Sequence, residues 1–394
     1  RRDQDDHIAE LSSLNMDRID LVAVNLYPFA ATIARPDVTL EDALENIDIG
    51  GPTMLRAAAK NFPFVSVVVD PSDYFWVAEG LIAGDLDAEH RRKLAQKAFQ
   101  HVAYYDTLIS HYLEGSGDKF GDRITLGYEK LYDLRYGENP HQQAAFYKEA
   151  MPSMGVAGAT QLHGKELSYN NILDADAAWR AVSDFLEPAA AVIKHTNACG
   201  LAVHEDQAQA YQMAFDGDPV SAFGGIVAFN REVTVETAQA MRQVFYEIVV
   251  APAFSSDALE VLKKKRDLRI LELGNGNGVD TANLEVRQVL GGLLAQTPDK
   301  LDEKPEDWQV VTEHKPTEQQ WSDLVFAWKA VKHIKSNAIV VVKDSRILGM
   351  GAGQPNRITS VNLALKAAGK GAQGSILASD AFFPFADGVE AAAE

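Results

Sequence analysis

The stretch that decides the fold is residues 189–200, which read AAAVIKHTNACG. Its first five residues are small or β-branched and apolar, and such a run predicts a buried strand. Lys194 and His195 follow at once, and polar groups at the end of a buried strand are well placed for chemistry because a rigid core holds them. A structural interpretation is equally open, in which Lys194 extends its ammonium group to solvent and His195 caps the strand.

The composition limits the class of protein. A chain of 394 residues with 46% hydrophobic content is long enough for two or three domains. Its formal net charge of -19 argues against an extended surface for nucleic acid or anionic membrane, and favours small anionic ligands in a local basic pocket. A single cysteine excludes an internal disulfide or a multi-thiolate metal site, and fits a reducing cytoplasm. The sequence contains no signal peptide and no apolar run long enough to span a membrane.

The first third of the chain reads as alternating strands and helices, which predicts an α/β domain. Gly50-Gly51 is expected to form a turn before a helix, where free backbone N–H groups and the helix dipole would suit a phosphate. A plain structural turn explains these two glycines about as well. Tyr27 is expected at a strand end. Buried strands are predicted over residues 19–24 and 64–70, and helices over 54–60 and 92–113.

The rest of the chain contains one order of elements twice. After a polar, aromatic stretch at residues 131–142, which suits a ligand-contacting loop or a linker, the order is helix, strand, turn, strand, helix, strand. It returns after a polar connection over 297–316, so we predict two copies of one α/β unit. The first copy is predicted as 172–186, 189–193, 201–204, 207–215 and 225–229, and the second as 317–331, 338–342, 349–353, a helix from 354 and 375–380. A site at the seam would combine Lys194 and His195 with Asn337, Arg357 and the aromatic residues 382–385.

The chemistry open to this seam is metal-free. His195-x-Asn197-x-Cys199 invites comparison with zinc deaminases, but their glutamate and second thiol are absent, so three zinc ligands cannot be assembled. Cys199 is either a nucleophile with His195 as its base or a small buried thiol. What remains is a histidine that takes a proton, a lysine that gives one or holds an anion, and an asparagine amide facing an oxyanion. Acyl or formyl transfer needs these three roles.

Seven motifs in a fixed order resemble one family. They are NLYPF (25–29), NIDIGG (46–51), RYGENPHQ (135–142), KH (194–195), SAFGG (221–225), KSNAI (335–339) and SDAFFPF (379–385). Together they resemble the bifunctional purine biosynthesis (PurH) family, which combines AICAR transformylase with IMP cyclohydrolase, and the resemblance runs almost end to end. It implies a methylglyoxal-synthase-like cyclohydrolase domain over 1–125, then a transformylase domain over 126–394. The latter would consist of two cytidine-deaminase-like α/β units, roughly 126–297 and 317–394.

The resemblance also implies a reaction. A formyl group passes from 10-formyltetrahydrofolate, the co-substrate, to the 5-amino group of AICAR, giving FAICAR, which then closes to IMP. His195 would accept the amine proton, Lys194 would assist proton transfer, and Asn337 would polarise the formyl oxygen. The implied partners are these small molecules and a second copy in a homodimer, with no catalytic metal, nucleic acid or membrane. The alternative is a catalytically silent purine-nucleotide-binding fragment.

The same resemblance implies the remaining site residues. The nucleotide of the transformylase would be bound by Arg135, Tyr136, His141, Phe223, Glu247 and Arg357, and the folate by Gly224, Ile358, Phe382, Pro384 and Asp387. Ring closure would use Tyr27, Asp48 and Lys60, with Gly50 and Gly51 in the nucleotide pocket. Two positions depart from the family, since Ala198 replaces the usual proline and Ala386 the usual arginine. The family also implies sequence before Arg1 and after Glu394, so we expect both ends to be cut.

Overall fold

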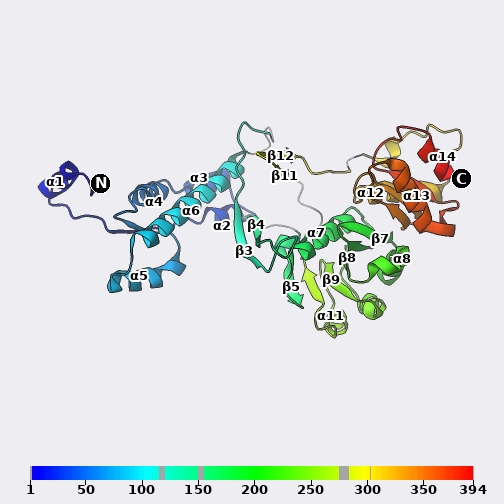
Figure 1. Ribbon diagram of the computed structural model, residues 1–394, viewed down its shortest axis with the longest axis horizontal. Helices are drawn as coiled ribbons and strands as arrows, with labels where there is room; N and C mark the ends of the chain where they lie inside the picture. The colour runs from blue at the N-terminus through cyan, green and yellow to red at the C-terminus, as the bar shows by residue number, and fades with distance from the viewer. Residues whose placement is uncertain (1, 115–119, 150–154, 275–283, 302, 394) are drawn as a thin grey trace. The chain divides into compact units, whose positions relative to one another are not determined.

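The computed structural model describes residues 2–114, 120–149, 155–274, 284–301 and 303–393 (Figure 1). The chain divides into two compact units. Unit 1 comprises residues 1–129 with 149–152, and unit 2 comprises residues 130–148 with 153–394. Within the described ranges, no helix combines the length and the apolar character that a membrane crossing needs.

Unit 1 contains a short parallel strand pair packed against helices. β1 pairs with β2 in the register Leu21↔Ser66, and Leu55, Val67 and Leu94 are buried between the strands and the long helix α6. The elements are α1 (Asp5–Ser13), β1 (Leu21–Ala23), α2 (Phe29–Ile33), α3 (Leu40–Glu45), α4 (Gly50–Lys60), β2 (Ser66–Val68), α5 (Tyr74–Ala83) and α6 (Ala88–Glu114). The predicted helix over 92–113 is confirmed as α6, with four further residues at its start and one at its end.

Two predictions in unit 1 are wrong. The first strand is not buried, because β1 pairs with β2 alone in the described chain and Leu21 remains 42% exposed. Gly50 and Gly51 do not form a turn before the helix but are its first two residues. Gly51 suits this position because a Cβ there would lie 2.6 Å from both the Asp48 carboxylate and the Leu26 side chain.

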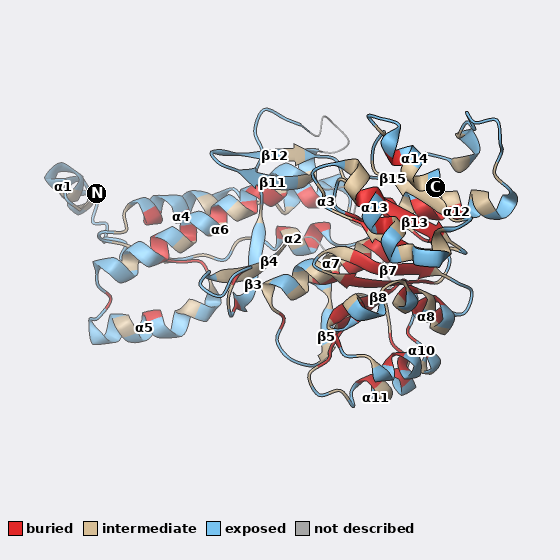
Figure 2. Cartoon of the chain, turned by 45° about the vertical axis from the view of Figure 1, so that its right-hand side comes forward, coloured by how far each residue is buried: buried red, intermediate tan, exposed pale blue. Residues whose placement is uncertain are grey.

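Unit 2 is built, in its described part, on a nine-stranded mixed sheet with the order β15-β13-β14-β7-β6-β8-β9-β10-β5. The central strands are fully buried on both faces (red in Figure 2), which explains their continuous apolar runs. The strands outside the two copies are β5 (Thr160–His163), β9 (Tyr246–Ala251) and β10 (Arg269–Glu272), with helices α9 (Pro219–Ala222), α10 (Val235–Ala240), α11 (Ser256–Leu262) and α14 (Asp387–Ala393). Two ribbons stand apart from this sheet, β3 (Tyr128–Leu134) with β4 (Ala144–Glu149), and β11 (Glu285–Val289) with β12 (Gly292–Gln296).

The predicted order of elements is present in both copies. The first copy is α7 (Tyr169–Ser183), β6 (Ala189–Lys194), β7 (Asn197–Val203), α8 (Gln207–Gly217) and β8 (Gly225–Phe229). The second is α12 (Glu318–Val331), β13 (Ile339–Lys343), β14 (Arg346–Gly351), α13 (Arg357–Ala368) and β15 (Ile376–Ser379). The sheet order mirrors this duplication, because β15-β13-β14 meets β7-β6-β8 at the antiparallel β14/β7 pair.

Two predicted boundaries in unit 2 are wrong by four residues, and α7 and β14 each begin three residues earlier than predicted. Residues 197–200 are not a turn but the start of β7, because the connection from β6 needs only His195 and Thr196. Residues 131–134 are not a loop but the end of β3, which pairs with β4 and leaves residues 135–142 as the connection.

Candidate functional site

The Lys194–His195 pair lies on a tight hairpin between β6 and β7. His195 and Thr196 have φ values of 52° and 60°, the pattern of a type I′ turn. Lys194 is half-buried as a residue, and its ammonium group donates to the Phe223 carbonyl at 2.9 Å in an exposed contact, whereas His195 is exposed. The Lys194 ammonium group is therefore held by a backbone carbonyl. This argues against the structural interpretation in which that group extends freely into solvent.

Asp174 of α7 holds this turn by hydrogen bonds to its backbone. Its carboxylate accepts a hydrogen bond from the His195 N–H at 3.2 Å and from the Thr196 N–H at 2.6 Å. Sequence reasoning missed Asp174. The available signal was an acidic residue on a helix that otherwise packs alanine and tryptophan side chains into the core.

The strand registers bring several predicted residues to one end of the sheet. β6 ends where β8 begins, in the pair Ile193↔Ile226, and β8 runs parallel to β9. Asn197 lies across the repeat seam, because its side-chain oxygen accepts the Lys335 N–H at 3.3 Å. β13 begins at that seam and pairs with the end of β15 in Ile339↔Ser379. Lys194, His195, Phe223, Glu247, Asn337 and Arg357 therefore belong to strand or helix ends on this side of the sheet.

Asn337 and Arg357 are joined in one polar network. The Arg357 guanidinium donates to the Asn337 side-chain oxygen at 2.7 Å and to the Ser379 hydroxyl at 2.7 Å, and it also pairs with Asp380. The Asn337 amide donates to the Gln354 carbonyl at 2.8 Å. Both ends of the Asn337 side chain are thus oriented, and its second amide N–H has no hydrogen-bond partner among the described residues.

Asp380 is the second residue that sequence reasoning missed. It accepts the Ala338 N–H at 3.0 Å in addition to the Arg357 guanidinium. Burial acts to raise the pKa of Asp380, but hydrogen bonds from Ser336 and Arg357 outweigh it and hold that pKa below its ordinary value. Ser379-Asp380 follows a strand in the same way as Lys194-His195, and this was the signal available in the sequence.

Glu247 and the Phe223–Gly224 segment are held by neighbouring strands. The Arg269 guanidinium, which is 5% exposed, donates to the Glu247 carboxylate at 2.7 Å. Gly224 has φ 72°, a conformation that favours glycine, and its N–H donates to the Phe245 carbonyl at 2.8 Å. Phe223 stays 62% exposed, so its ring is free to contact a ligand.

The other predicted ligand residues of unit 2 are less closely connected. Arg135 lies over the Tyr136 ring at 5.5 Å on the β3–β4 connection, which also holds His141 and approaches α7 through Asn170 and the Glu138 carbonyl at 3.5 Å. Of the predicted folate residues other than Gly224, Ile358 lies in the first turn of α13, Phe382 and Pro384 follow β15, and Asp387 begins α14. No hydrogen bond joins these four to Lys194 or His195 in the described ranges.

Unit 1 separates Lys60 from its other predicted residues. The Asp48 carboxylate accepts the Gly51 N–H at 2.7 Å, and the Tyr105 hydroxyl accepts the Asp48 N–H at 2.9 Å. Lys60 is the last residue of α4, whereas Gly50 is the first, so the helix rise puts them about 15 Å apart. Tyr27 is 55% exposed but lies near this group, because its charge is among the influences that raise the pKa of Tyr105.

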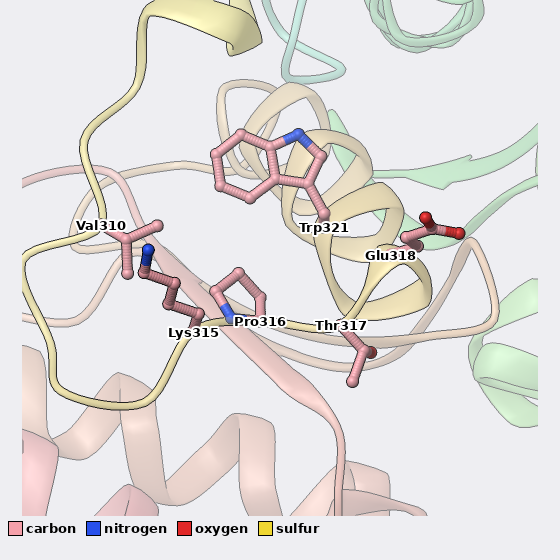
Figure 3. A pocket seen from close by; sticks show the side chains of 6 residues that line it. All are labelled: Val310, Lys315, Pro316, Thr317, Glu318 and Trp321. Atoms are coloured by element: carbon pink, nitrogen blue, oxygen red, sulfur yellow. The ribbon is translucent and has the colours of Figure 1, made fainter.

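A cavity elsewhere in unit 2 does not coincide with these residues. It has a volume of about 330 Å³ and lies where the connection between the copies enters α12 (Figure 3). None of the predicted site residues lines it; the described lining consists of Val310, Lys315, Pro316, Thr317, Glu318 and Trp321.

The structure favours one of the two interpretations of Cys199. Burial raises the pKa of the Cys199 thiol to about 11, so it is protonated at neutral pH, which favours the small buried thiol over the nucleophile. Within the part of the chain that the structure describes, no group of three His, Cys, Asp or Glu side chains could hold a metal ion.

Comparisons with known proteins show which family the chain belongs to. The AICARFT/IMPCHase bienzyme family matches residues 58–367. The bifunctional purine biosynthesis protein PurH of Bacillus cytotoxicus is 54% identical over 396 residues, covering 100% of this chain and 77% of the relative, and that of Bacillus cereus is 53% identical over the same shares. A solved structure, that of ForH, is 34% identical over 29% of this chain and 61% of its own, with a TM-score of 0.26. By its matched length and these identities, the chain belongs to the AICARFT/IMPCHase bienzyme family.

Proposed function

We propose that this chain transfers the formyl group of 10-formyltetrahydrofolate to the 5-amino group of AICAR, giving FAICAR, and that FAICAR then closes to IMP with loss of water. Family membership supports both steps. The observation that carries the first is the placement of Lys194 and His195 beside the segment that holds Asn337, at one end of the sheet of unit 2.

The formyl transfer needs one proton moved from the amine to the departing folate nitrogen. The amine attacks the formyl carbon, and His195, exposed on its turn, takes the proton that the amine loses. When the carbon–nitrogen bond to the folate breaks, that nitrogen gains a proton. The Lys194 ammonium group, held by the Phe223 carbonyl, is the donor that we assign to assist this step.

The negative charge on the formyl oxygen needs a fixed donor. The Asn337 side-chain oxygen is held by Arg357, and one amide N–H by the Gln354 carbonyl. The second amide N–H is therefore oriented before the substrate arrives, as stabilisation of an oxyanion requires. We assign the ribonucleotide to Arg135, Tyr136, His141, Phe223, Glu247 and Arg357, and the folate to Gly224, Ile358, Phe382, Pro384 and Asp387.

The finer domain assignment belongs to the same proposal. Residues 1–125 would form the methylglyoxal-synthase-like cyclohydrolase domain, with Tyr27, Asp48, Lys60, Gly50 and Gly51 at its site. Residues 126–394 would form the transformylase, and the duplicated order of elements supports its two cytidine-deaminase-like units, roughly 126–297 and 317–394. We also propose a homodimer that shares the transformylase site.

The test is to assay the folded full-length protein with AICAR and 10-formyltetrahydrofolate for tetrahydrofolate release, and with FAICAR for IMP formation. We expect Lys194→Ala and His195→Ala to lower tetrahydrofolate release about 10²- to 10⁴-fold, the usual contribution of a proton-transfer group. Both variants should leave IMP formation unchanged, because those residues lie in unit 2. Calorimetry that shows AICAR binding without turnover would instead indicate a nucleotide-binding module.

A further inference from the structure

The turn that presents His195 is unfavourable for its own sequence. Both of its residues adopt left-handed φ values, 52° and 60°, which are normally taken by Asn, Asp or Gly. Thr196 is β-branched, and this conformation is a marked outlier for such a residue. Some other part of the structure must therefore stabilise the turn.

The Asp174 carboxylate provides that support through the backbone. It accepts the N–H of His195 at 3.2 Å and that of Thr196 at 2.6 Å, so one side chain holds both residues of the turn. A carboxylate suits this task because it offers acceptors only, whereas an asparagine has a single oxygen and would turn its own N–H donors toward the turn.

The second copy contains the same device. Asp323 of α12 accepts the Asp344 N–H at 3.1 Å and the Ser345 N–H at 2.8 Å, and those residues have φ values of 53° each. In both copies the carboxylate precedes the first turn residue by 21 positions. The support therefore belongs to the fold, and only the first copy applies it to a histidine.

The position of the His195 imidazole depends on this backbone. Its ring forms no hydrogen bond with any described residue, and the residue is exposed. The His195 carbonyl accepts the Thr196 hydroxyl at 2.7 Å and the Asn197 amide at 2.9 Å, so every recorded restraint on His195 acts on its main chain. We propose that Asp174 is a positioning residue, which fixes the backbone of residues 195–196 so that His195 meets the amine of the substrate. This inference rests on the proposed formyl transfer.

The test compares Asp174→Asn with its twin Asp323→Asn in the full chain. We expect D174N to lower kcat for tetrahydrofolate release about 10- to 100-fold, the effect of displacing a reacting group by about 1 Å, with the KM for AICAR within about twofold. D323N should leave kcat within about twofold of wild type and lower the melting temperature at least as much as D174N does, because Asp323 is 4% exposed whereas Asp174 is half-buried. A purely structural role would not separate the twins in this way.

A rescue variant keeps the test decisive even if D174N alone fails to fold. Glycine adopts left-handed φ without steric cost, so D174N/T196G should fold. Its kcat should rise above that of D174N by at least about a third of the fold-loss that D174N shows relative to wild type. Equal kcat losses in D174N and D323N, unchanged kcat in D174N, or a folded D174N/T196G that stays as inactive as D174N would each overturn the inference. A folded wild type without turnover would overturn the proposed function, and this inference with it, before any variant is compared.

Discussion

The two copies in unit 2 share their supports and differ in the groups that they support. Each copy turns through two left-handed residues held by a carboxylate from the preceding helix. In each, a lysine before the turn donates to a backbone carbonyl, Lys194 to Phe223 at 2.9 Å and Lys343 to Gln373 at 3.3 Å. The first turn residue is His195 in one copy and Asp344 in the other. The two copies therefore share the backbone support of the turn and differ in the side chain that the turn presents.

The residue after the last strand of each copy also differs, and here the second copy carries the charged side chain. Asn230 after β8 accepts the Ala189 N–H at 2.8 Å, as Asp380 after β15 accepts the Ala338 N–H at 3.0 Å. The Asn230 amide group donates to two backbone carbonyls. The Asp380 carboxylate instead forms an ion pair with Arg357. Because β7 and β14 are antiparallel, Asp380 and the His195 turn lie at the same end of the sheet, and the Asp344 turn lies at the other.

The largest effect is expected when the first turn residue of the first copy is replaced by the residue found at the matching position of the second copy. His195→Asp should keep the fold, because aspartate tolerates the left-handed conformation and Asp344 occupies the matching position. It should lower kcat for tetrahydrofolate release about 10²- to 10⁴-fold, because aspartate is a much weaker base than imidazole. Steady-state kinetics with AICAR and 10-formyltetrahydrofolate would measure this.

The matched control is Asp344→His in the second copy, which should leave kcat unchanged because that turn lies at the far end of the sheet. A folded H195D enzyme with more than about a tenth of wild-type kcat would contradict the assigned role of His195. Activity lost equally in both variants would show that the two copies do not differ in function.

The sequence predicted the elements of the two copies because their apolar runs and helical spacing are strong. It placed the start of β7 wrongly because His195-Thr196 lacks the Asn-Gly pattern of a type I′ turn. The turn exists because Asp174, distant in sequence, holds it. Such tertiary support has no local signature, which is why a four-residue error arose at the centre of the site.

The candidate site was predictable where strand ends carry unusual residues, as at Lys194 and His195. Asp380 had the same local signal, but its partner Arg357 is 23 residues away and no spacing rule links them. In unit 1 the exposure of β1 depends on which strands cover it, and the sequence of a single strand does not contain that information. Patterns thus predict elements, and the polar contacts between elements require the structure.

A smaller effect is expected from Asp380→Asn, which gives the second copy the residue type that the first copy has at the matching position, Asn230. The Arg357 guanidinium and Asp380 are 9% and 18% exposed, so losing the charge should cost about 2 kcal/mol of unfolding free energy and raise the KM for AICAR as Arg357 and Asn337 loosen. Because folding lowers the pKa of Asp380, its contribution is complete above the ordinary value of 3.8 and is lost as pH falls through the folded pKa.

Urea denaturation of wild type and D380N at several pH values would measure this difference. The two stability curves should be separated at pH 7 and converge in the acid range below about pH 4. A gap that stays constant with pH would contradict a charge-based role for Asp380. It would imply that the asparagine introduced at position 380 serves the backbone as Asn230 does, and that the copies do not differ here.

The smallest effect is expected from Lys343→Met, the second-copy counterpart of the Lys194 change. The Lys343 ammonium group lies 3.3 Å from the Gln373 carbonyl, at the end of the sheet away from His195, and a weak, solvent-accessible hydrogen bond contributes little. We expect the unfolding free energy to change by less than about 0.5 kcal/mol and tetrahydrofolate release to stay at wild-type level. If K343M lowered tetrahydrofolate release as Lys194→Ala does, both ends of the sheet would take part in the reaction, and the division of labour between the copies would be wrong.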